Sequence, residues 1–221
     1  MFAEPENRTK VKICGLTTLE DARFVSGALA DYLGFIFYPD SPRYVDPAKA
    51  GAIINWLEGP GKVGVFVNQP LDDVNSISRQ TGVDYVQLHG NESPDYCALV
   101  DKPIIKAFHI EKDTDREKLQ SDIEPYLDHI EYLLFDTKIN GKWGGTGETF
   151  NWDILTEISN DKPFFLSGGI NPENVEEAIQ TVAPYAIDLS SGLEESPGLK
   201  DFDKIELFFD RMRDIWEEQE L

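Results

Sequence analysis

The stretch Phe164-Phe165-Leu166-Ser167-Gly168-Gly169-Ile170-Asn171-Pro172 reads as a buried strand, a glycine pair and the start of a helix. Its apolar residues favour a strand, whereas Asn171 is a good N-cap and Pro172 suits the first helical position. Glu173 and Glu176 would lie in the first turn of that helix, where acidic groups interact favourably with the helix dipole. A strand that passes through a short loop into a helix is one βα unit. The stretch therefore predicts an α/β fold.

The same unit recurs along the whole chain as short runs rich in Val, Ile and Phe that alternate with helical patterns. The expected strands are 11–15, 33–38, 62–67, 85–90, 103–109, 132–137, 164–169 and 185–190. The expected helices are about 19–30, 47–57, 71–81, 94–100, 114–129, 151–159, 172–182 and 202–218. Eight units in about 200 residues predict a (β/α)8 barrel, or TIM barrel. An open doubly wound sheet is the alternative, but such a sheet usually has about five to seven strands, which would leave one unit unexplained.

Length and composition limit the domain organisation and the cellular compartment. The 221 residues contain no Gly/Ser-rich or Pro-rich linker, so we expect a single barrel domain over 1–221 with its core at about 11–218. No apolar run approaches the roughly 18 residues of a membrane span, and MFAEPENRTK lacks the apolar stretch of a secretory signal. Two distant cysteines form no disulfide framework. We expect a cytoplasmic protein without a membrane partner.

The charge balance of 20 basic and 41 acidic residues gives a net charge of −21. Such a field repels phosphate backbones and anionic lipids, so we expect no nucleic-acid partner. A small anionic substrate is still compatible with this charge, because amides and a few cations can dominate the potential inside a cleft. The acidic excess is either an adaptation to a saline environment or an ordinary solvated surface.

In a TIM barrel the active site lies at the C-terminal ends of the strands. Polar residues gather at these ends, and an unpaired buried polar group costs several kcal/mol, so core packing explains the whole set poorly. They are Lys12, Cys14, Gln87, His89, Lys106, His109, Asp136, Ser167, Gly168, Gly169 and the segment 188–192.

Lys12 and Cys14 stand two positions apart on the first strand, so they share a face about 6 to 7 Å apart. Lys12 would favour the charged thiolate of Cys14, which is otherwise mostly protonated at neutral pH. The alternative for Cys14 is a small inert core residue.

Asp136 ends an apolar strand, where partial burial would let it donate a proton near neutral pH. In a closed ring of eight strands it would face Cys14 from three strands away, which suits a proton-shuttling isomerisation. Alternatively, Asp136 caps its loop by accepting bonds from backbone amides.

Arg43 lies in the loop after the second strand, at the same end of the barrel. Its planar fork suits a substrate carboxylate. The alternative is a surface arginine paired with Asp40 or Asp46.

The loops after strands seven and eight contain Ser167-Gly168-Gly169 and Ser190-Ser191-Gly192. Barrels of this kind commonly bind phosphate here, because the glycines let backbone N–H groups approach an anion. A third glycine-rich stretch at 141–147 follows strand six and is either a mobile flap or a second phosphate contact.

Six motifs, in order from residue 11 to about 209, resemble the phosphoribosylanthranilate isomerase family of tryptophan biosynthesis. They are Lys12-Ile13-Cys14-Gly15-Leu16-Thr17, Ser41-Pro42-Arg43-Tyr44-Val45, Val86-Gln87-Leu88-His89-Gly90, Asp136 followed by Gly144-Gly145-Thr146-Gly147, Ser167-Gly168-Gly169-Ile170-Asn171-Pro172-Glu173-Asn174-Val175, and Asp188-Leu189-Ser190-Ser191-Gly192-Leu193-Glu194. The resemblance implies an isomerase that needs no cofactor and no metal. Its reaction would be the Amadori rearrangement of N-(5'-phosphoribosyl)anthranilate, a small phosphoribosyl substrate, to 1-(2-carboxyphenylamino)-1-deoxyribulose 5-phosphate. For the oligomeric state we expect a monomer or a homodimer, and the sequence does not decide between them.

The resemblance assigns a role to each matching residue. Asp136 would be the general acid and Cys14 the general base. The substrate-binding residues would be Lys12, Arg43, Gln87, His89 and Asp188. The phosphate-binding residues would be Gly168, Gly169, Ser191 and Gly192. The chain departs from the family at Glu148 and Asn151, where relatives often have a lysine and an aspartate.

Three other functions would require different residues. A pentulose-phosphate epimerase would need paired aspartates and metal-binding histidines, which the scattered His89, His109 and His129 do not supply. The α subunit of tryptophan synthase would need a glutamate and an aspartate as its acid and base. A non-catalytic binder of phosphoribosyl ligands would have a phosphate site without a paired acid and base.

Overall fold

The fold is that of a computed structural model, which describes residues 8–111, 114–139, 142–143, 151–156, 158 and 161–219. Its parallel strands are β1 (Lys10–Ile13), β2 (Tyr32–Ile36), β3 (Gly61–Phe66), β4 (Tyr85–Leu88), β5 (Ile104–Ile110), β6 (Tyr132–Ile139), β8 (Phe164–Leu166) and β9 (Ala186–Leu189). Each of the predicted strands overlaps one of these, with bounds that agree within three residues. The βα reading of the sequence is confirmed.

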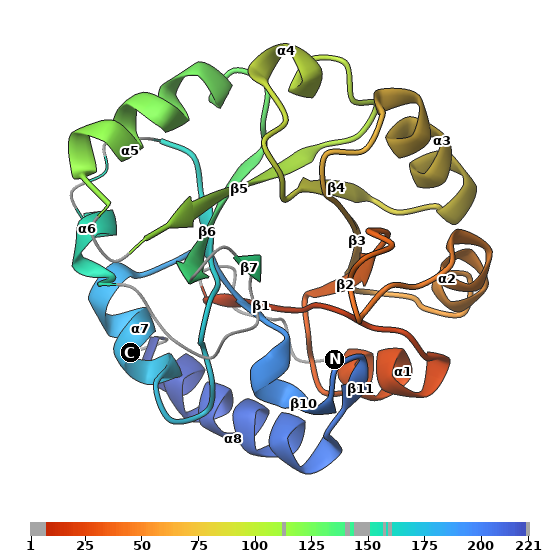
Figure 1. Ribbon diagram of the computed structural model, residues 1–221. Coiled ribbons are helices and arrows are strands. Elements are labelled where there is room, and N and C mark those ends of the chain that lie inside the picture. Colours follow the sequence, from red (N-terminus) through yellow and green to blue (C-terminus); the bar gives the residue numbers. More distant parts are fainter. Residues whose placement is uncertain are drawn as a thin grey trace.

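The strands close into a ring in the order β5-β4-β3-β2-β1-β9-β8-β6, because β6 also pairs with β5. Every pairing around the ring is parallel, and helices surround it on the outside (Figure 1). The closed ring confirms the TIM barrel and excludes the open doubly wound sheet. Beyond the ring, β7 (Lys142–Trp143) extends β6 as an antiparallel hairpin, and β10 (Glu194–Ser196) pairs with β11 (Leu199–Lys200).

The helices are mostly shorter than predicted. They are α1 (Leu19–Gly27), α2 (Pro47–Ile54), α3 (Leu71–Thr81), α4 (Pro94–Cys97), α5 (Arg116–Ile123), α6 (Asp153–Thr156), α7 (Val175–Val182) and α8 (Phe202–Gln219), with the 3-10 turns η1 (Glu124–Tyr126) and η2 (Ser191–Leu193). Within the described residues, every helix is too short or too polar to cross a bilayer.

Helix α7 corrects the prediction that Pro172 opens a helix. The Asn171 side chain accepts bonds from the N–H groups of Glu173 and Asn174, at 2.9 and 3.2 Å. These bonds form a turn of their own, so the helix begins at Val175, one turn later than predicted. The physical reason is that an Asn side chain stabilises a local turn as readily as a helix N-cap.

The barrel separates two apolar regions. Alternate strand residues point outward to pack under the helices, while the inward ones fill the lower half of the barrel around Tyr32, Ile105, Leu134 and Phe165. The upper half, toward the strand C-termini, holds polar side chains instead. Apolar packing thus stabilises the lower half of the barrel, and the polar upper half contains the candidate site.

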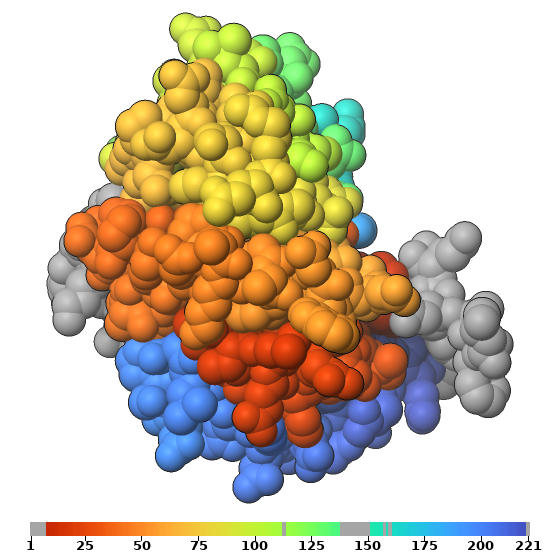
Figure 2. Space-filling view, turned by 90° about the vertical axis from the view of Figure 1, so that its right-hand side faces the viewer, coloured from red at the N-terminus to blue at the C-terminus, as the bar shows by residue number. Residues whose placement is uncertain are grey.

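The two ends of the described chain meet on one side of the barrel. Figure 2 shows the red N-terminal part of the described chain directly against its blue C-terminal part. On this side the Trp216 indole N–H donates to the Thr9 carbonyl at 2.8 Å, and the Arg8 guanidinium stacks on the Trp216 ring at 4.1 Å. Helix α8 therefore stabilises the position of β1, from which Lys12 and Cys14 project.

Candidate active site

A cavity of about 530 Å³ opens at the C-terminal ends of the strands. Nearly all of the site residues predicted from sequence line it. They are Cys14, Arg43, Gln87, His89, Asp136, Gly168, Gly169, Asp188, Ser191 and Gly192. The alternation of side chains along each strand brings them together, since only every second residue faces the barrel interior.

Lys12 is the predicted site residue that does not line this cavity. Its side chain is fully buried, and its Nζ donates to the Asp188 carboxylate at 2.8 Å. Burial alone would lower the pKa of Lys12, but Asp188 and Cys14 together raise it above its ordinary value. Lys12 therefore carries a positive charge within the barrel and contacts Asp188, which does reach the cavity.

Cys14 is 6% exposed and faces the cavity from the end of β1. Burial raises the pKa of its thiol, and the Asp188 carboxylate adds to that effect, whereas Lys12 and Lys200 lower it. The net shift is upward. Lys12 favours the thiolate, as expected, but burial of Cys14 outweighs this effect and keeps the pKa of the thiol above its ordinary value.

Asp136 faces Cys14 from β6, three strands away around the ring through β9 and β8. It is 3% exposed, and its Oδ2 lies 3.2 Å from His89 Nε2. The Gln87 amide N–H donates to His89 Nδ1 at 3.0 Å, which leaves Nε2 as the ring nitrogen that lies toward Asp136. Asp136 is buried, as expected from its apolar strand, and it also has a polar neighbour in His89.

His109 completes this cluster from β5. Its Nε2 donates to the His89 carbonyl at 3.0 Å, and its Nδ1 lies 4.0 Å from Asp136 Oδ2. Burial, reinforced by the nearby His89, lowers the pKa of His109 to about 4. His109 is therefore neutral at physiological pH. Lys106, also a polar residue of this strand, points to the outer side and pairs with Glu92 at 2.9 Å.

The described residues include one cluster of side chains that could hold a metal ion. His89, His109 and Asp136 offer ligand atoms that lie within 4.8 Å of one another. A zinc ion with bonds of about 2.0 to 2.1 Å would hold its ligand atoms only about 3 Å apart. His109 Nδ1 lies 4.0 Å from Asp136 Oδ2, farther apart than two ligands of one zinc ion, so the cluster does not fit a zinc centre as it stands.

Arg43 projects into the cavity from the loop between β2 and α2. Its Nε and Nη2 donate to both oxygens of the Glu194 carboxylate, at 2.7 to 3.0 Å. The two acidic residues considered from the sequence have other partners: Asp46 caps α2, and Asp40 accepts from the Tyr38 hydroxyl. The surface-arginine alternative is therefore excluded.

The predicted phosphate loops are shaped by glycines that no other residue could replace without strain. Gly168 has a φ of +87°, and a Cβ there would lie 2.3 Å from Thr137 Oγ1. A Cβ on Gly192 would lie 2.6 Å from the Ile170 carbonyl oxygen. Ser191 and Gly192 begin η2, so their N–H groups have no acceptor within that turn. Both loops line the cavity.

Sequence reasoning missed two residues of this site, Glu194 and Lys200. In the sequence Glu194 is only the last residue of the sixth motif, and Lys200 belongs to none of the motifs. The dipeptide Pro197-Gly198 signals a turn and was an available sign of the hairpin that carries both. The glycine-rich stretch at 141–147 and Glu148 fall outside the described residues, apart from the backbone of β7.

Comparisons with known proteins point to one family. The family model described as N-(5'phosphoribosyl)anthranilate (PRA) isomerase matches residues 11–211. A curated N-(5'-phosphoribosyl)anthranilate isomerase of Geobacter metallireducens is 43% identical over 205 residues, which cover 92% of this chain and 98% of the relative. The relative of the same description from Citrifermentans bemidjiense is 46% identical over 198 residues, covering 89% of this chain and 93% of its own.

Solved structures agree. The phosphoribosyl anthranilate isomerase of Thermotoga maritima superposes with a TM-score of 0.84 at 38% identity, covering 93% of this chain and 99% of its own. A second structure, a phosphoribosyl anthranilate isomerase in complex with reduced 1-(o-carboxyphenylamino)-1-deoxyribulose 5-phosphate, has a TM-score of 0.80 at 34% identity and covers 93% and 99% of the two chains.

Proposed function

The chain belongs to the N-(5'-phosphoribosyl)anthranilate isomerase family, and from this membership and the cavity geometry we propose how its residues carry out the reaction. The protein is an isomerase of tryptophan biosynthesis that converts N-(5'-phosphoribosyl)anthranilate to 1-(2-carboxyphenylamino)-1-deoxyribulose 5-phosphate. The epimerase, the tryptophan synthase α subunit and the non-catalytic binder are thereby set aside. One observation carries the assignment of roles: Cys14 and Asp136 face each other across a single cavity that also contains both glycine loops.

Ring opening is assigned to Asp136. In its protonated form it gives a proton to the furanose ring oxygen, while the nitrogen lone pair forms the C1'=N bond and the bond from C1' to the ring oxygen breaks. His89, whose Nε2 lies 3.2 Å from Asp136 Oδ2, then stabilises the carboxylate left behind.

Proton abstraction is assigned to Cys14. Its thiolate takes the C2' proton, the electron pair forms the C1'=C2' bond, and the iminium nitrogen becomes the neutral amine of an enolamine. Tautomerisation of the enolamine then gives the ketose. Burial raises the pKa of the Cys14 thiol, while the neighbouring Lys12 and Lys200 charges favour the thiolate that this step uses.

The remaining residues hold the substrate. Arg43 binds the anthranilate carboxylate, Asp188 bonds a sugar hydroxyl, and backbone amides at Gly168, Gly169, Ser191 and Gly192 receive the phosphate. Gln87 and His89 support Asp136. Lys12 acts from beneath the cavity through Asp188 and Cys14, because it does not line the cavity.

The wider setting of the protein is also a proposal. The net charge of −21 favours a protein that does not bind nucleic acid, and a biosynthetic role fits the cytoplasm. The barrel is proposed to be the whole domain, as a monomer or a homodimer. A Thermotoga maritima relative is described as a dimeric enzyme from which monomers were generated.

Turnover by purified variants tests the two catalytic roles. Cys14→Ala and Asp136→Asn should each lower kcat by about 10²- to 10⁴-fold or more, without added cofactor in any assay. Cys97→Ala is the matched control, since Cys97 is equally buried but lies in α4, outside the cavity. Circular dichroism confirms that each variant is folded. Near-normal turnover by a folded Cys14 or Asp136 variant would refute that residue's role. Growth of a tryptophan auxotroph that lacks the isomerase tests the activity itself.

A further inference from the structure

Arg43 offers only part of its guanidinium to a substrate. Its Nε and Nη2 edge is bound by Glu194, while Nη1 donates to none of the described residues. A guanidinium has five N–H groups, so Nη1 and the second hydrogen of Nη2 can still bind one further carboxylate. Glu194 is therefore placed to fix the plane of the guanidinium while it leaves the other half of the fork available.

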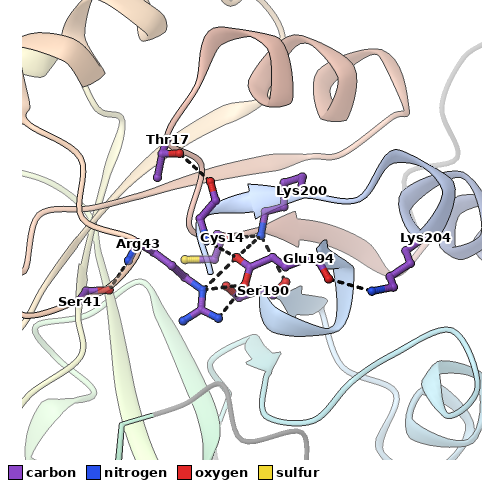
Figure 3. A network of polar contacts seen from close by, with 9 residues as sticks. Cys14, Thr17, Ser41, Arg43, Ser190, Glu194, Lys200 and Lys204 are labelled. Atoms are coloured by element: carbon purple, nitrogen blue, oxygen red, sulfur yellow. Dashed lines mark hydrogen bonds and ion pairs between the residues drawn. The ribbon is translucent and has the colours of Figure 1, made fainter. Parts of the chain in front are cut away.

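Lys200 connects Glu194 to two other parts of the site. Its side chain is fully buried, and its Nζ donates to Glu194 Oε1 at 3.0 Å, to the Cys14 carbonyl at 2.8 Å and to the Ser190 carbonyl at 3.3 Å. An ammonium group has three N–H donors, so all of them are used. Figure 3 shows Glu194 between Arg43 and Lys200, beside Cys14. The Glu194–Lys200 ion pair thus connects three parts of the site. These are Arg43, the end of β1 at Cys14, and the loop before Ser191.

The hairpin that supplies these residues has no part in closing the barrel. The ring of eight strands is complete without β10 and β11, which pair only with each other. Instead the hairpin is attached to the loop after β1, where the Thr17 hydroxyl donates to the Gly198 carbonyl at 2.7 Å. Its buried charges therefore need a reason other than fold closure, because burying an ion pair is rarely a net gain in stability.

The charges of the group suggest that reason. Arg43 and Lys200 contribute two positive charges and Glu194 one negative charge, which leaves a net charge of +1 beside the cavity. One substrate carboxylate would balance that charge. Without Glu194 the two cations would repel each other and the guanidinium would lose the partner that orients it.

We propose that Glu194 and Lys200 form a positioning pair, which holds Arg43 as a clamp for one substrate carboxylate and keeps that clamp in register with Cys14 and the phosphate loop. This inference rests on the proposed function, in which Arg43 binds the anthranilate carboxylate. It adds that the selectivity for a carboxylated substrate depends on two residues that do not touch the substrate.

Two ligands separate positioning from general stability. The first is the reduced 1-(o-carboxyphenylamino)-1-deoxyribulose 5-phosphate bound by a structural relative, and the second is the same compound without its carboxylate. Calorimetry on folded Glu194→Gln should show affinity for the first ligand reduced by about 10- to 100-fold, and affinity for the second changed by less than about threefold. Equal losses for both ligands, or no loss for either, would overturn the proposal.

The wild-type protein separates failure of this inference from failure of the proposed function. If Arg43 is the carboxylate clamp, wild-type protein binds the carboxylated ligand much more tightly than the ligand without the carboxylate. Equal affinities in the wild type would refute the role of Arg43 itself. Unequal affinities that Glu194→Gln leaves unchanged would refute only the positioning pair.

Two more variants complete the design. Glu194→Asp retains the charge but is shorter by one methylene, so it should fold and still bind the carboxylated ligand more weakly; wild-type affinity would contradict the proposal. Lys204→Met is the matched control, because Lys204 donates to the Glu194 main-chain carbonyl at 2.8 Å and not to its carboxylate. Its binding and turnover should stay at wild-type values. A loss in Lys204→Met as large as that in Glu194→Gln would mean that the whole hairpin, rather than the pair, is responsible.

Discussion

Lys12 and Asp188 stand opposite each other in the pairing of β1 with β9, and their side chains form an ion pair of 2.8 Å with 0% and 5% of the two side chains exposed. Two charges in the barrel interior stabilise each other only while both are present, because either alone would be buried without compensation. Both members of the pair are therefore needed to stabilise this part of the barrel core, where Asp188 lines the cavity and Lys12 lies beneath it.

Removing one partner should be costly. Lys12→Met is expected to lower the free energy of unfolding by about 3 to 5 kcal/mol, as measured by urea denaturation, because Asp188 is left as an unpaired buried charge. Arg79→Met is the matched control, since Arg79 pairs with Asp101 at the surface and should contribute less than about 1 kcal/mol. Adding Asp188→Asn to Lys12→Met should recover part of the loss. If Lys12→Met is no less stable than Arg79→Met, the pair does not stabilise the core.

The thiol of Cys14 should react slowly at neutral pH. Burial and the Asp188 carboxylate raise the pKa of the Cys14 thiol more than Lys12 and Lys200 lower it. Alkylation by iodoacetamide should therefore increase with pH, with a midpoint above the ordinary thiol value of about 8.5. Cys97→Ala protein removes the second thiol from the assay. In the same protein kcat/KM should increase with pH above neutrality, because the base must be the thiolate. Rapid alkylation of Cys14 at pH 7 would contradict the upward shift.

Replacing Gly168 should destabilise the protein for two reasons, its left-handed backbone and its crowded surroundings. One control variant separates them. Gly168→Ala combines a left-handed backbone at φ +87° with a Cβ only 2.3 Å from Thr137, and should cost about 2 to 5 kcal/mol. Gly59→Ala has a φ of +95° but open space around its Cβ, so it should cost only about 1 to 2 kcal/mol. Chemical denaturation measures both. Equal losses would show that crowding against Thr137 contributes nothing.

His109 should make the protein less stable in mild acid. Its folded-state pKa of about 4 lies below the ordinary value of 6.5, so between these pH values the unfolded chain binds the proton more readily. The free energy of unfolding should then fall by up to about 1.4 kcal/mol per pH unit as the pH decreases from 6.5 to 4. His89, Asp136 and Lys106 surround His109 and contribute to this shift.

Substitution isolates the contribution of that histidine. His109→Gln should flatten the pH dependence of stability, whereas His129→Gln, at an exposed position, should leave it as in the wild type. Denaturation series from pH 4 to 7 compare the two variants. An unchanged slope in His109→Gln would show that another group is responsible.

Much of the fold was predictable because it follows from local patterns. Buried strands of Val, Ile and Phe, each followed by a helical pattern, specify βα units, and eight such units leave few arrangements besides a closed barrel. Helix ends were less predictable, since Asn171 forms a turn of its own and delays α7 until Val175. The competition between a side-chain turn and a helix cap is decided by small energies that the pattern does not reveal.

The candidate site was predictable where chemistry sits on alternate strand residues. Cys14, Asp136 and Asp188 face the cavity because they occupy inward positions at strand ends. The same rule distinguishes His109, which faces inward, from Lys106, which faces the outer layer and pairs with Glu92. The alternation of side chains does not show how deep along the barrel an inward-facing residue lies. Lys12 was therefore expected in the cavity, but it lies beneath the cavity.

The sequence by itself determined the barrel, the end at which its cavity lies and the residues that we propose as acid, base and anion site. Only the tertiary structure decided the partners of the charged groups: Asp188 for Lys12, Glu194 for Arg43 and Lys200 for the Cys14 carbonyl. These contacts join residues 176, 151 and 186 positions apart, because closing the ring brings β9 and the β10–β11 hairpin against β1. Local patterns carry no information about pairs at such separations. The closure of the ring therefore decides which partner each buried charge has, how deeply Cys14 is buried and which side of the Arg43 guanidinium stays available.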